Sequence, residues 1–222
     1  MFNWDGLFAA LEAWRNAENA IAGTEPSVTT VAERYRHDPW AVLVSTILSL
    51  RTKDEVTLVA STKFLAKAPN PAALRGLSVE ETEKIVFPAG FYHTKAASLK
   101  KIAEILGTDY GDKVPSDLDT LLTLPGVGRK TANLVLIEAF DMDGVCVDTH
   151  VHRICNRLGL LTTQTPNETE LILRKIMPRR YWKTINALLV LYGQRLCRPI
   201  SPFCSRCTAA QFCKKVGVGK AR

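Results

Sequence analysis

Residues 124–136 read LPGVGRKTANLVL, and this stretch predicts two helices joined by a tight turn. Pro-Gly-Val-Gly supplies the turn, and the apolar run after Lys130 predicts the second helix. Gly126 and Gly128 tolerate positive φ and carry no side chain that would hold a partner away. The pattern is typical of a helix-hairpin-helix.

The predicted turn offers a binding site for an anion. The first N–H groups of the second helix have no acceptor within the helix, and they point outward. Phosphate is the expected anion, because the chain of 222 residues has a formal net charge of +7 and a pI of about 9.2. Backbone N–H groups that bind phosphate read no base sequence. We therefore expect Gly126 and Gly128 to contact a nucleic-acid backbone.

Lys130 has two interpretations on this pattern. It lies at the positive end of the second helix dipole, where an ammonium is disfavoured, so it is a plausible amine nucleophile. The alternative is that it makes one more phosphate contact. The hairpin stretch alone does not separate the two.

Helical periodicity recurs along the chain and no segment alternates strictly, so we expect an all-α fold. The pattern predicts a first helix over residues 4–22, a loop over 23–30 and a buried helix over 39–50. Ser78 and Glu81 form a predicted capping box. We expect two helical domains, one of residues 35–144 and one of residues 1–34 with 145–222.

No window holds the roughly 18 uninterrupted apolar residues that a membrane span needs. The first residues, Met-Phe-Asn-Trp-Asp, also lack the layout of a signal peptide. We expect the protein to be intracellular.

Four of the six cysteines lie close together near the C-terminus, with the spacing C-x6-C-x2-C-x5-C: Cys197, Cys204, Cys207 and Cys213. The clustering favours metal binding over free thiols. An iron–sulfur cluster takes four cysteines in a short run, whereas zinc sites usually show two close pairs and only one C-x2-C is present. Both metals stay open at this point. Cys146 and Cys155 sit in apolar surroundings and are expected to be buried core residues.

Basic residues are interspersed with these cysteines and follow the last of them: Arg198, Arg206, Lys214 and Lys215. A basic loop pinned by a metal favours docking onto phosphates. The alternative is an ordinary solvated face around a stabilising metal site.

Asp148 follows an apolar stretch and precedes a predicted helix that contains His150 and His152. An aspartate at a helix N-cap stabilises by about 1 kcal/mol and needs no other justification. The functional interpretation is a carboxylate beside Lys130 that moves protons or stabilises a developing cation. Both roles are compatible. A histidine within a helix is more often packed than catalytic, so His152 is not expected to act in catalysis.

Several motifs together resemble the endonuclease III family of helix-hairpin-helix DNA glycosylases and abasic-site lyases. These are LPGVGRKTA, VDTH with its aspartate eighteen residues after the lysine, and the C-x6-C-x2-C-x5-C tail. DPWAVLVSTILSLRTKD and GFYHTKA resemble two further family segments, so the likeness covers about Pro26 to Cys213.

The resemblance implies a six-helix barrel domain with the hairpin beside a [4Fe-4S] domain, whose cluster the four cysteines hold. Lys130 would attack C1′ of a flipped nucleotide, and Asp148 would assist base departure and proton transfer. Gly126, Gly128, Arg129 and His150 would contact DNA. The implied partner is double-stranded DNA with damaged bases or abasic sites. We expect a monomer in the cytoplasm, associated with the nucleoid through DNA.

Two positions depart from the family pattern. Arg51 stands where the family commonly has glutamine, in a loop that fills the space left by the flipped base, and Phe91 replaces a smaller aliphatic wedge. An arginine there can hydrogen-bond to a base edge, and a phenylalanine can stack in the duplex. Our hypothesis is that Arg51 sharpens the preference for the opposite base, with guanine favoured.

The main functional expectation is a bifunctional glycosylase and lyase that removes oxidised pyrimidines. A mismatch-directed monofunctional glycosylase of the same superfamily is the second candidate, and Lys130 argues against it. The third is a non-catalytic DNA-binding module, which the presence of both Lys130 and Asp148 disfavours.

Overall fold

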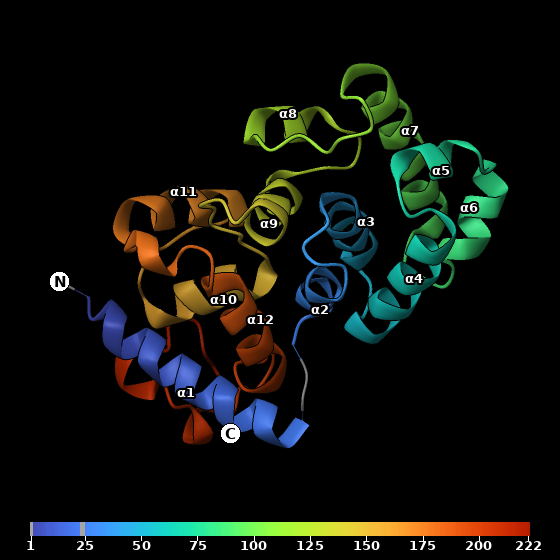
Figure 1. Cartoon of the computed structure of the whole chain (residues 1–222). Coiled ribbons are helices and arrows are strands. Elements are labelled where there is room, and N and C mark those ends of the chain that lie inside the picture. The colour runs from blue at the N-terminus through green and yellow to red at the C-terminus, as the bar shows by residue number, and fades with distance from the viewer. Residues whose placement is uncertain (1, 23–24) are drawn as a thin grey trace. The chain divides into compact units, whose positions relative to one another are not determined.

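The computed structural model describes residues 2–22 and 25–222, without the side chains of residues 19–22. Helices account for all the regular structure in these ranges, and no strand occurs there (Figure 1). The helices are α1 (Trp4–Ala22), α2 (Ser27–Arg34), α3 (Pro39–Ser49), α4 (Asp54–Lys67), α5 (Pro71–Arg75), α6 (Val79–Val86), α7 (Tyr92–Asp109), α8 (Leu118–Thr123), α9 (Arg129–Phe140), α10 (Thr149–Leu158), α11 (Pro166–Ile176) and α12 (Ile185–Arg195). Three short 3-10 turns are η1 (Arg179–Tyr181), η2 (Cys204–Arg206) and η3 (Ala210–Phe212). The expected all-α class is confirmed.

The contacts of the chain define two compact units. Pro26–Met142 forms the first, and Met1–Glu25 with Asp143–Arg222 forms the second. We refer to them as the hairpin unit and the cysteine unit. The expected boundary at residues 34 and 35 was wrong, because α2 belongs to the hairpin unit, and the second boundary falls after residue 142 rather than 144.

Helix α2 begins inside the segment 23–30 that we expected to be a loop. Residues 23 and 24 lie outside the described residues, and the helix starts at Ser27. Its N-cap, Pro26, makes no side-chain capping bond, so the local start signal is weak. Packing on α3 and α4 supplies the stability instead, with Val31 fully buried and Ser27 Oγ donating to Asp54 Oδ1 at 2.7 Å.

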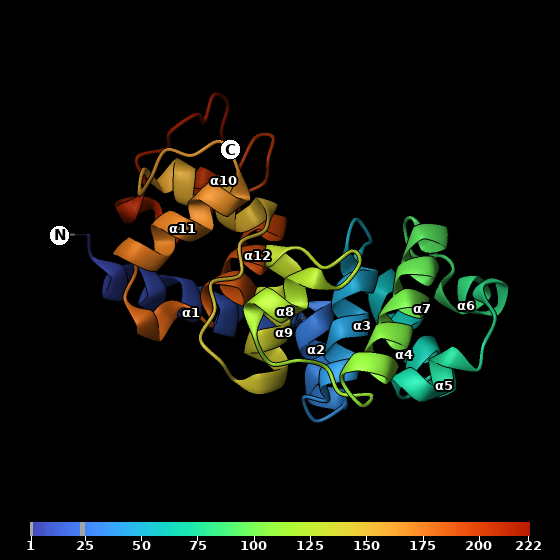
Figure 2. The same cartoon turned by 90° about the horizontal axis from the view of Figure 1, so that it is seen from above.

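Helix α3 is the centre of the hairpin unit and is buried from Trp40 to Leu48. It packs against α2, α4, α7 and α9, which surround it in both views (Figures 1 and 2). Asp38 caps it by accepting from the N–H of Ala41 at 2.8 Å. The apolar run therefore forms the buried helix that its composition predicts.

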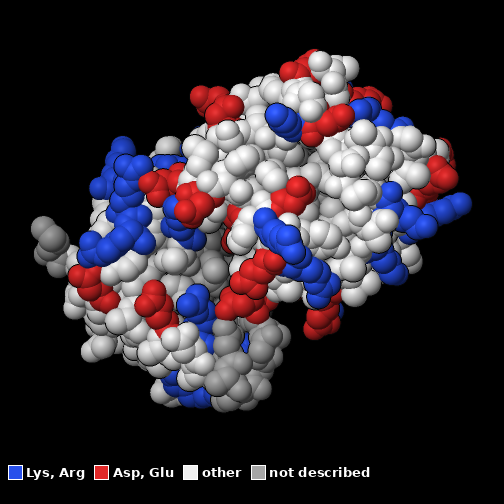
Figure 3. All heavy atoms as spheres, in the orientation of Figure 1, with Lys and Arg blue, Asp and Glu red and all other residues white. Residues whose placement is uncertain are grey.

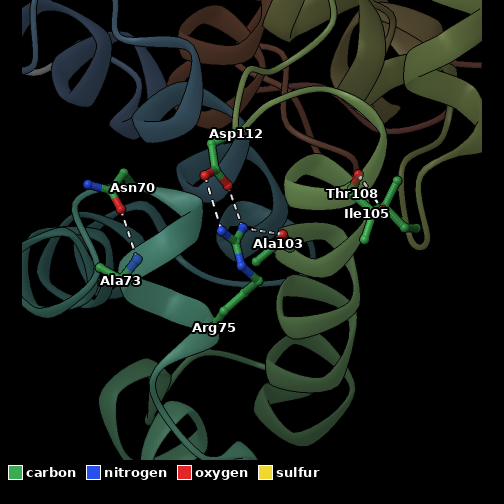
Figure 4. Close-up of polar contacts among 7 residues, drawn as sticks. All are labelled: Asn70, Ala73, Arg75, Ala103, Ile105, Thr108 and Asp112. Atoms are coloured by element: carbon green, nitrogen blue, oxygen red, sulfur yellow. Dashed lines mark hydrogen bonds and ion pairs between the residues drawn. The ribbon is translucent and has the colours of Figure 1, made fainter.

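An ion pair joins α5 to the loop after α7 (Figure 4). The guanidinium of Arg75 holds both carboxylate oxygens of Asp112 and also donates to the carbonyl of Ala103 at 2.9 Å. This pairing lowers the pKa of Asp112. Gly107 leaves the room that the guanidinium occupies, because a Cβ there would lie 2.4 Å from Arg75 Nη1.

The cysteine unit has its own apolar core, in which α1 and α10 pack against α12 and α11 packs against α10. Phe8 of α1 stacks on Tyr181 with ring centroids 3.8 Å apart. Cys146 and Cys155 are both fully buried, as expected, and burial raises the pKa of Cys155 to about 12.

One face of the molecule carries charged side chains of both signs. On the face drawn in Figure 3, basic and acidic side chains are interspersed over the surface. On this face the net positive charge of the chain is therefore not gathered in one patch.

No helix among the described residues is long and apolar enough to cross a membrane.

Candidate active site

The hairpin turn lies between α8 and α9 in the hairpin unit. The N–H of Val127 donates to the carbonyl of Leu124 at 3.1 Å, and both side chains are buried, which anchors the turn. Gly126 has φ +79°, a conformation that favours glycine, whereas Gly128 is extended at φ −98°. Positive φ is therefore needed at one of the two glycines only. Gly128 is the N-cap of α9, and a Cβ added there would meet nothing within 4 Å.

Arg129 and Lys130 are the first two residues of α9, directly after this turn. Both side chains are half-buried. An amine at this position lies near the outward N–H groups of the helix start, which are suited to a phosphate. The structure thus places Lys130 at the start of the second helix, as the pattern predicted, and it does not separate the two interpretations.

Asp148 is the N-cap of α10 in the cysteine unit. Its Oδ1 accepts from the N–H groups of His150 and Val151, at 2.8 and 2.9 Å. The buried segment 144–147 holds it in place, while its own side chain is half-buried. The capping role is observed, and these two bonds leave Oδ2 unused. Lys130 and Asp148 belong to different units, so their pairing stays a prediction.

The histidines near Asp148 are tied to neighbouring side chains. His150 Nδ1 lies 3.1 Å from Nη2 of Arg153, and its Cβ approaches Gly193 so closely that a Cβ on that glycine would lie 3.0 Å away. His152 Nδ1 lies 2.7 Å from Thr169 Oγ1. The structure therefore places His152 in a structural network, as expected, and its geometry does not test the proposed DNA contact of His150.

Arg51 and Phe91 lie together in the hairpin unit, although forty residues separate them. Both adopt left-handed backbone conformations, with φ of 52° and 56°, and both side chains are exposed. The Cζ atom of Arg51 lies 5.4 Å from the centroid of the Phe91 ring. They line a cavity of about 340 Å³ that also touches Gly126 of the hairpin turn.

Lys95 lines the same cavity, and the sequence interpretation missed it. Its side chain is 6% exposed, and Nζ donates to the carbonyls of Leu48 and Leu50 and to Thr52 Oγ1 at 2.6–2.8 Å. Burial lowers the pKa of Lys95 to about 8. A signal was available, because Lys95 falls on the apolar stripe of α7 with Leu99 and Ile102.

The four clustered cysteines line one cavity in the cysteine unit, together with Arg157, Leu196 and Phe203. All four thiols are half-buried and none forms a disulfide. Burial is the main cause that raises the pKa of Cys213, and the nearby thiols raise it further. Among the described residues, no group of three or more His, Cys, Asp or Glu side chains has the arrangement of a metal site. The shared cavity and the all-sulfur donor set fit an iron–sulfur cluster in their chemistry.

Several hydrogen bonds reach the sulfurs from outside the loop. Arg157 Nη1 lies 3.4 Å from Cys197 Sγ, the Tyr192 hydroxyl 3.1 Å from Cys207 Sγ, and the N–H of Lys215 3.3 Å from Cys213 Sγ. Hydrogen bonds of this kind stabilise thiolates that ligate iron. The sequence interpretation did not identify Arg157 or Tyr192 as partners of these sulfurs.

Three guanidiniums surround the Phe203 ring at the start of the cysteine loop. The Cζ atoms of Arg198, Arg206 and Arg222 lie 5.3, 5.8 and 4.9 Å from its centroid. All three arginines are exposed. The ring therefore holds positive charge on the surface of the loop.

The family, the sequence relatives and the solved structures that resemble this chain agree with one another. Residues 44–179 match the family described as "HhH-GPD superfamily base excision DNA repair protein". The protein "Endonuclease III" of Thermotoga maritima is 44% identical over 188 residues, which cover 83% of this chain and 88% of that protein.

Two solved structures resemble the fold. "Structure of a Trapped Endonuclease III-DNA Covalent Intermediate: Estranged-Adenine Complex" has a TM-score of 0.76 and 32% identity, covering 80% of this chain and 84% of that one. "Structure of a thermostable thymine-DNA glycosylase" has a TM-score of 0.75 and 25% identity, covering 85% and 93%.

Proposed function

Because the chain belongs to the HhH-GPD superfamily of base excision DNA repair proteins, we propose that it is a bifunctional DNA glycosylase and abasic-site lyase. The expected resemblance to endonuclease III is confirmed, and the chain is a base excision DNA glycosylase. The proposal adds the reaction after base removal, the substrates and the residues that act. The substrates are oxidised pyrimidines in double-stranded DNA.

The position of Lys130 carries the proposal. It is the second residue of α9 and follows the turn directly, so a phosphate bound at the helix start would bring a sugar close to its amine. A glycosylase that only hydrolyses the base has no need of an amine nucleophile. Lysine in this place therefore favours the bifunctional reaction.

The reaction would proceed through a lysine Schiff base. Nζ of Lys130, after losing a proton, would form a bond to C1′ while the glycosidic bond breaks and the base leaves with the electron pair and takes a proton. Opening of the C1′–O4′ bond gives the iminium. Removal of a C2′ proton then expels the 3′ phosphate, and water hydrolyses the imine to release the lysine. Asp148 would move these protons through the oxygen that the helix cap leaves unused.

DNA would be gripped at sites on each unit. In the hairpin unit, Gly126, Gly128 and Arg129 present N–H groups and positive charge to one phosphate. In the cysteine unit, His150 is the second residue of α10, and the guanidiniums around Phe203 would offer further phosphate contacts. Such contacts are independent of sequence, as a repair enzyme requires.

The four cysteines would hold a [4Fe-4S] cluster. Bound there, it would supply four iron–thiolate bonds that brace the basic loop, and it would do no chemistry on the substrate. Arg157 supports the same loop by donating to the carbonyls of Arg198 and Pro199, both at 2.6 Å.

The structural similarity to a thymine-DNA glycosylase keeps a mismatch-directed enzyme as the second candidate. That function predicts base release without a covalent intermediate. A non-catalytic module predicts binding and neither reaction.

Borohydride trapping on a duplex with an abasic site separates the three. We expect wild type to give a covalent adduct, and we expect Lys130→Gln to give none while it still binds the duplex, since only the amine is lost. Lys101→Gln removes an exposed lysine on α7 and serves as the control that keeps the adduct.

Base release from a duplex with an oxidised pyrimidine is measured in parallel. Wild type that releases a mismatched base and forms no adduct would identify the second candidate. Binding with neither reaction would identify the module.

A further inference from the structure

The Lys95 amine holds two loops of the hairpin unit together. One connects α3 to α4 and carries Arg51, and the other connects α6 to α7 and carries Phe91. The three acceptors of the amine are Leu48 O at 2.8 Å, Leu50 O at 2.6 Å and Thr52 Oγ1 at 2.8 Å. An ammonium has three N–H donors, so this geometry uses every one of them. The acceptors come from the end of α3 and the residues directly after it, on both sides of Arg51.

The acceptors are neutral oxygens, and the lysine is buried. A buried charge is costly unless each of its donors is satisfied, so the three bonds must be kept together. Loss of any one acceptor would leave a buried donor unsatisfied. Lys95 therefore resists displacement of the chain on either side of Arg51.

The second loop is tied to the same hydroxyl. The N–H of Gly90 donates to Thr52 Oγ1 at 3.1 Å, so Thr52 accepts from both Lys95 and the residue before Phe91. The two loops also touch directly, because a Cβ on Gly90 would lie 2.5 Å from the carbonyl oxygen of Arg51. Any side chain at position 90 would push the loops apart.

Arg51 and Phe91 need this support because their backbones are strained. A left-handed conformation is uncommon for residues other than glycine and persists only where the surroundings impose it. Both side chains are nevertheless exposed, so burial contributes little to holding these conformations. The hydrogen bonds of Lys95 and Thr52 to the neighbouring backbone restrain these two conformations instead.

We propose that Lys95 is a positioning residue that ties the loops of Arg51 and Phe91 into one rigid pair, set to enter a DNA duplex together when a nucleotide is extruded. The inference rests on the proposed function and on the expectation from the sequence that Arg51 and Phe91 enter the duplex beside an extruded nucleotide. Rigid presentation lowers the entropy lost when both side chains insert.

Lys100 provides a matched comparison on the same helix. Its Nζ donates to three carbonyls, those of Leu74, Arg75 and Leu77, at 2.5–3.1 Å. It caps the end of α5 rather than the two loops. Lys95→Met and Lys100→Met therefore each remove an amine that donates three hydrogen bonds. Only the first substitution removes bonds to the loop that carries Arg51, which Thr52 joins to the loop of Phe91.

Amide hydrogen exchange tests the tie without DNA. We expect the Gly90 amide to exchange about tenfold faster in Lys95→Met than in wild type, and to keep its rate in Lys100→Met. Lys95→Gln keeps a shorter, uncharged donor at the same position, and it should give a smaller rise in the Gly90 exchange rate if Lys95→Met does not fold. An unchanged Gly90 amide in both variants would overturn the proposal.

Single-turnover excision of an oxidised pyrimidine tests the consequence. We expect Lys95→Met to slow excision about tenfold, because the inserting side chains are misplaced, with affinity for undamaged duplex unchanged. Lys100→Met should stay within about twofold of wild type. In an Arg51→Ala/Phe91→Ala background, Lys95→Met should slow excision almost no further, since the side chains that Lys95 positions are already absent.

The same slowing in both backgrounds would show that Lys95 acts generally on the fold, and the proposal would be wrong. A wild-type protein that forms no adduct and excises no base would instead refute the proposed function. The exchange experiment would still report on the tie itself.

Discussion

Arg51 combines an exposed guanidinium with a backbone that is held in a left-handed conformation. The Phe91 ring beside it restricts where the guanidinium can go. A guanidinium held in this way can donate two parallel hydrogen bonds to the O6 and N7 edge of guanine, which is the commonest specific contact to a base. Glutamine pairs instead with adenine in the same geometry, so we expect the residue at position 51 to influence the preference for the opposite base.

We expect wild type to excise one lesion about tenfold faster opposite guanine than opposite adenine, and Arg51→Gln to lose that preference. Excision rates of the same lesion opposite each of the four bases measure it. Arg36→Gln is the control, since Arg36 is also exposed and left-handed but lies after α2. Equal rates opposite all four bases in both wild type and Arg51→Gln would refute the hypothesis.

At the scale of the element, the hairpin depends on one strained position. Gly126 requires positive φ, and a Cβ there would lie 3.3 Å from Ser98 Oγ of α7. The turn is therefore shaped by its own backbone and by the neighbouring helix. Its N–H groups can only converge on a phosphate if that shape is kept.

Gly126→Ala should lower the free energy of unfolding by about 1–2 kcal/mol, from the strain of a left-handed alanine. It should also weaken binding to duplexes of any sequence, because the turn contacts backbone. Chemical denaturation and binding to undamaged DNA at fixed salt measure the two effects.

Gly111→Ala separates strain from binding. Gly111 has φ +56°, and a Cβ added there would meet nothing within 4 Å, so the substitution should cost similar stability and leave DNA affinity unchanged. If Gly126→Ala bound DNA as tightly as wild type, the hairpin would not be a phosphate site.

At the scale of the whole molecule, two units with separate cores carry different candidate site residues. The hairpin unit carries Lys130, Arg51 and Phe91, while the cysteine unit carries Asp148 and the four clustered thiols. Helix α10 connects Asp148 to the clustered thiols, since Asp148 caps its start and Arg157 near its end lies within hydrogen-bond distance of Cys197 Sγ. A change in the cysteine loop therefore bears on the element that presents Asp148.

Purified protein is expected to contain four iron and four sulfide per chain and to absorb in the visible range. Cys204→Ser should lose that absorbance and lower protection of the α10 and α12 amides from exchange, while α3 in the other unit keeps its protection. Cys155→Ala is the control, because Cys155 is buried outside the loop and should leave the colour intact. A colourless protein loaded with zinc after anaerobic purification would show that the metal assignment is wrong.

Local patterns predicted much of the fold and named several site residues. The capping box of Ser78 and Glu81, the buried α3, and Asp148 as an N-cap are all observed. Each depends on residues within one turn of each other, or on an apolar stripe that one helix carries by itself. The short spacing of the four cysteines predicted that they share one metal centre; the structure shows that they line one cavity, and the metal stays a prediction.

The sequence by itself therefore determined most of the helices, several of their caps, the hairpin and the residue types available for chemistry, because these follow from short-range geometry. Only the tertiary structure decided that α2 packs with the hairpin unit, that Lys95 is buried beneath Arg51, and that Phe91 lies beside them. These arrangements join residues that are distant in the chain. Their stability comes from burial and hydrogen bonds made only on packing, and no local pattern records them.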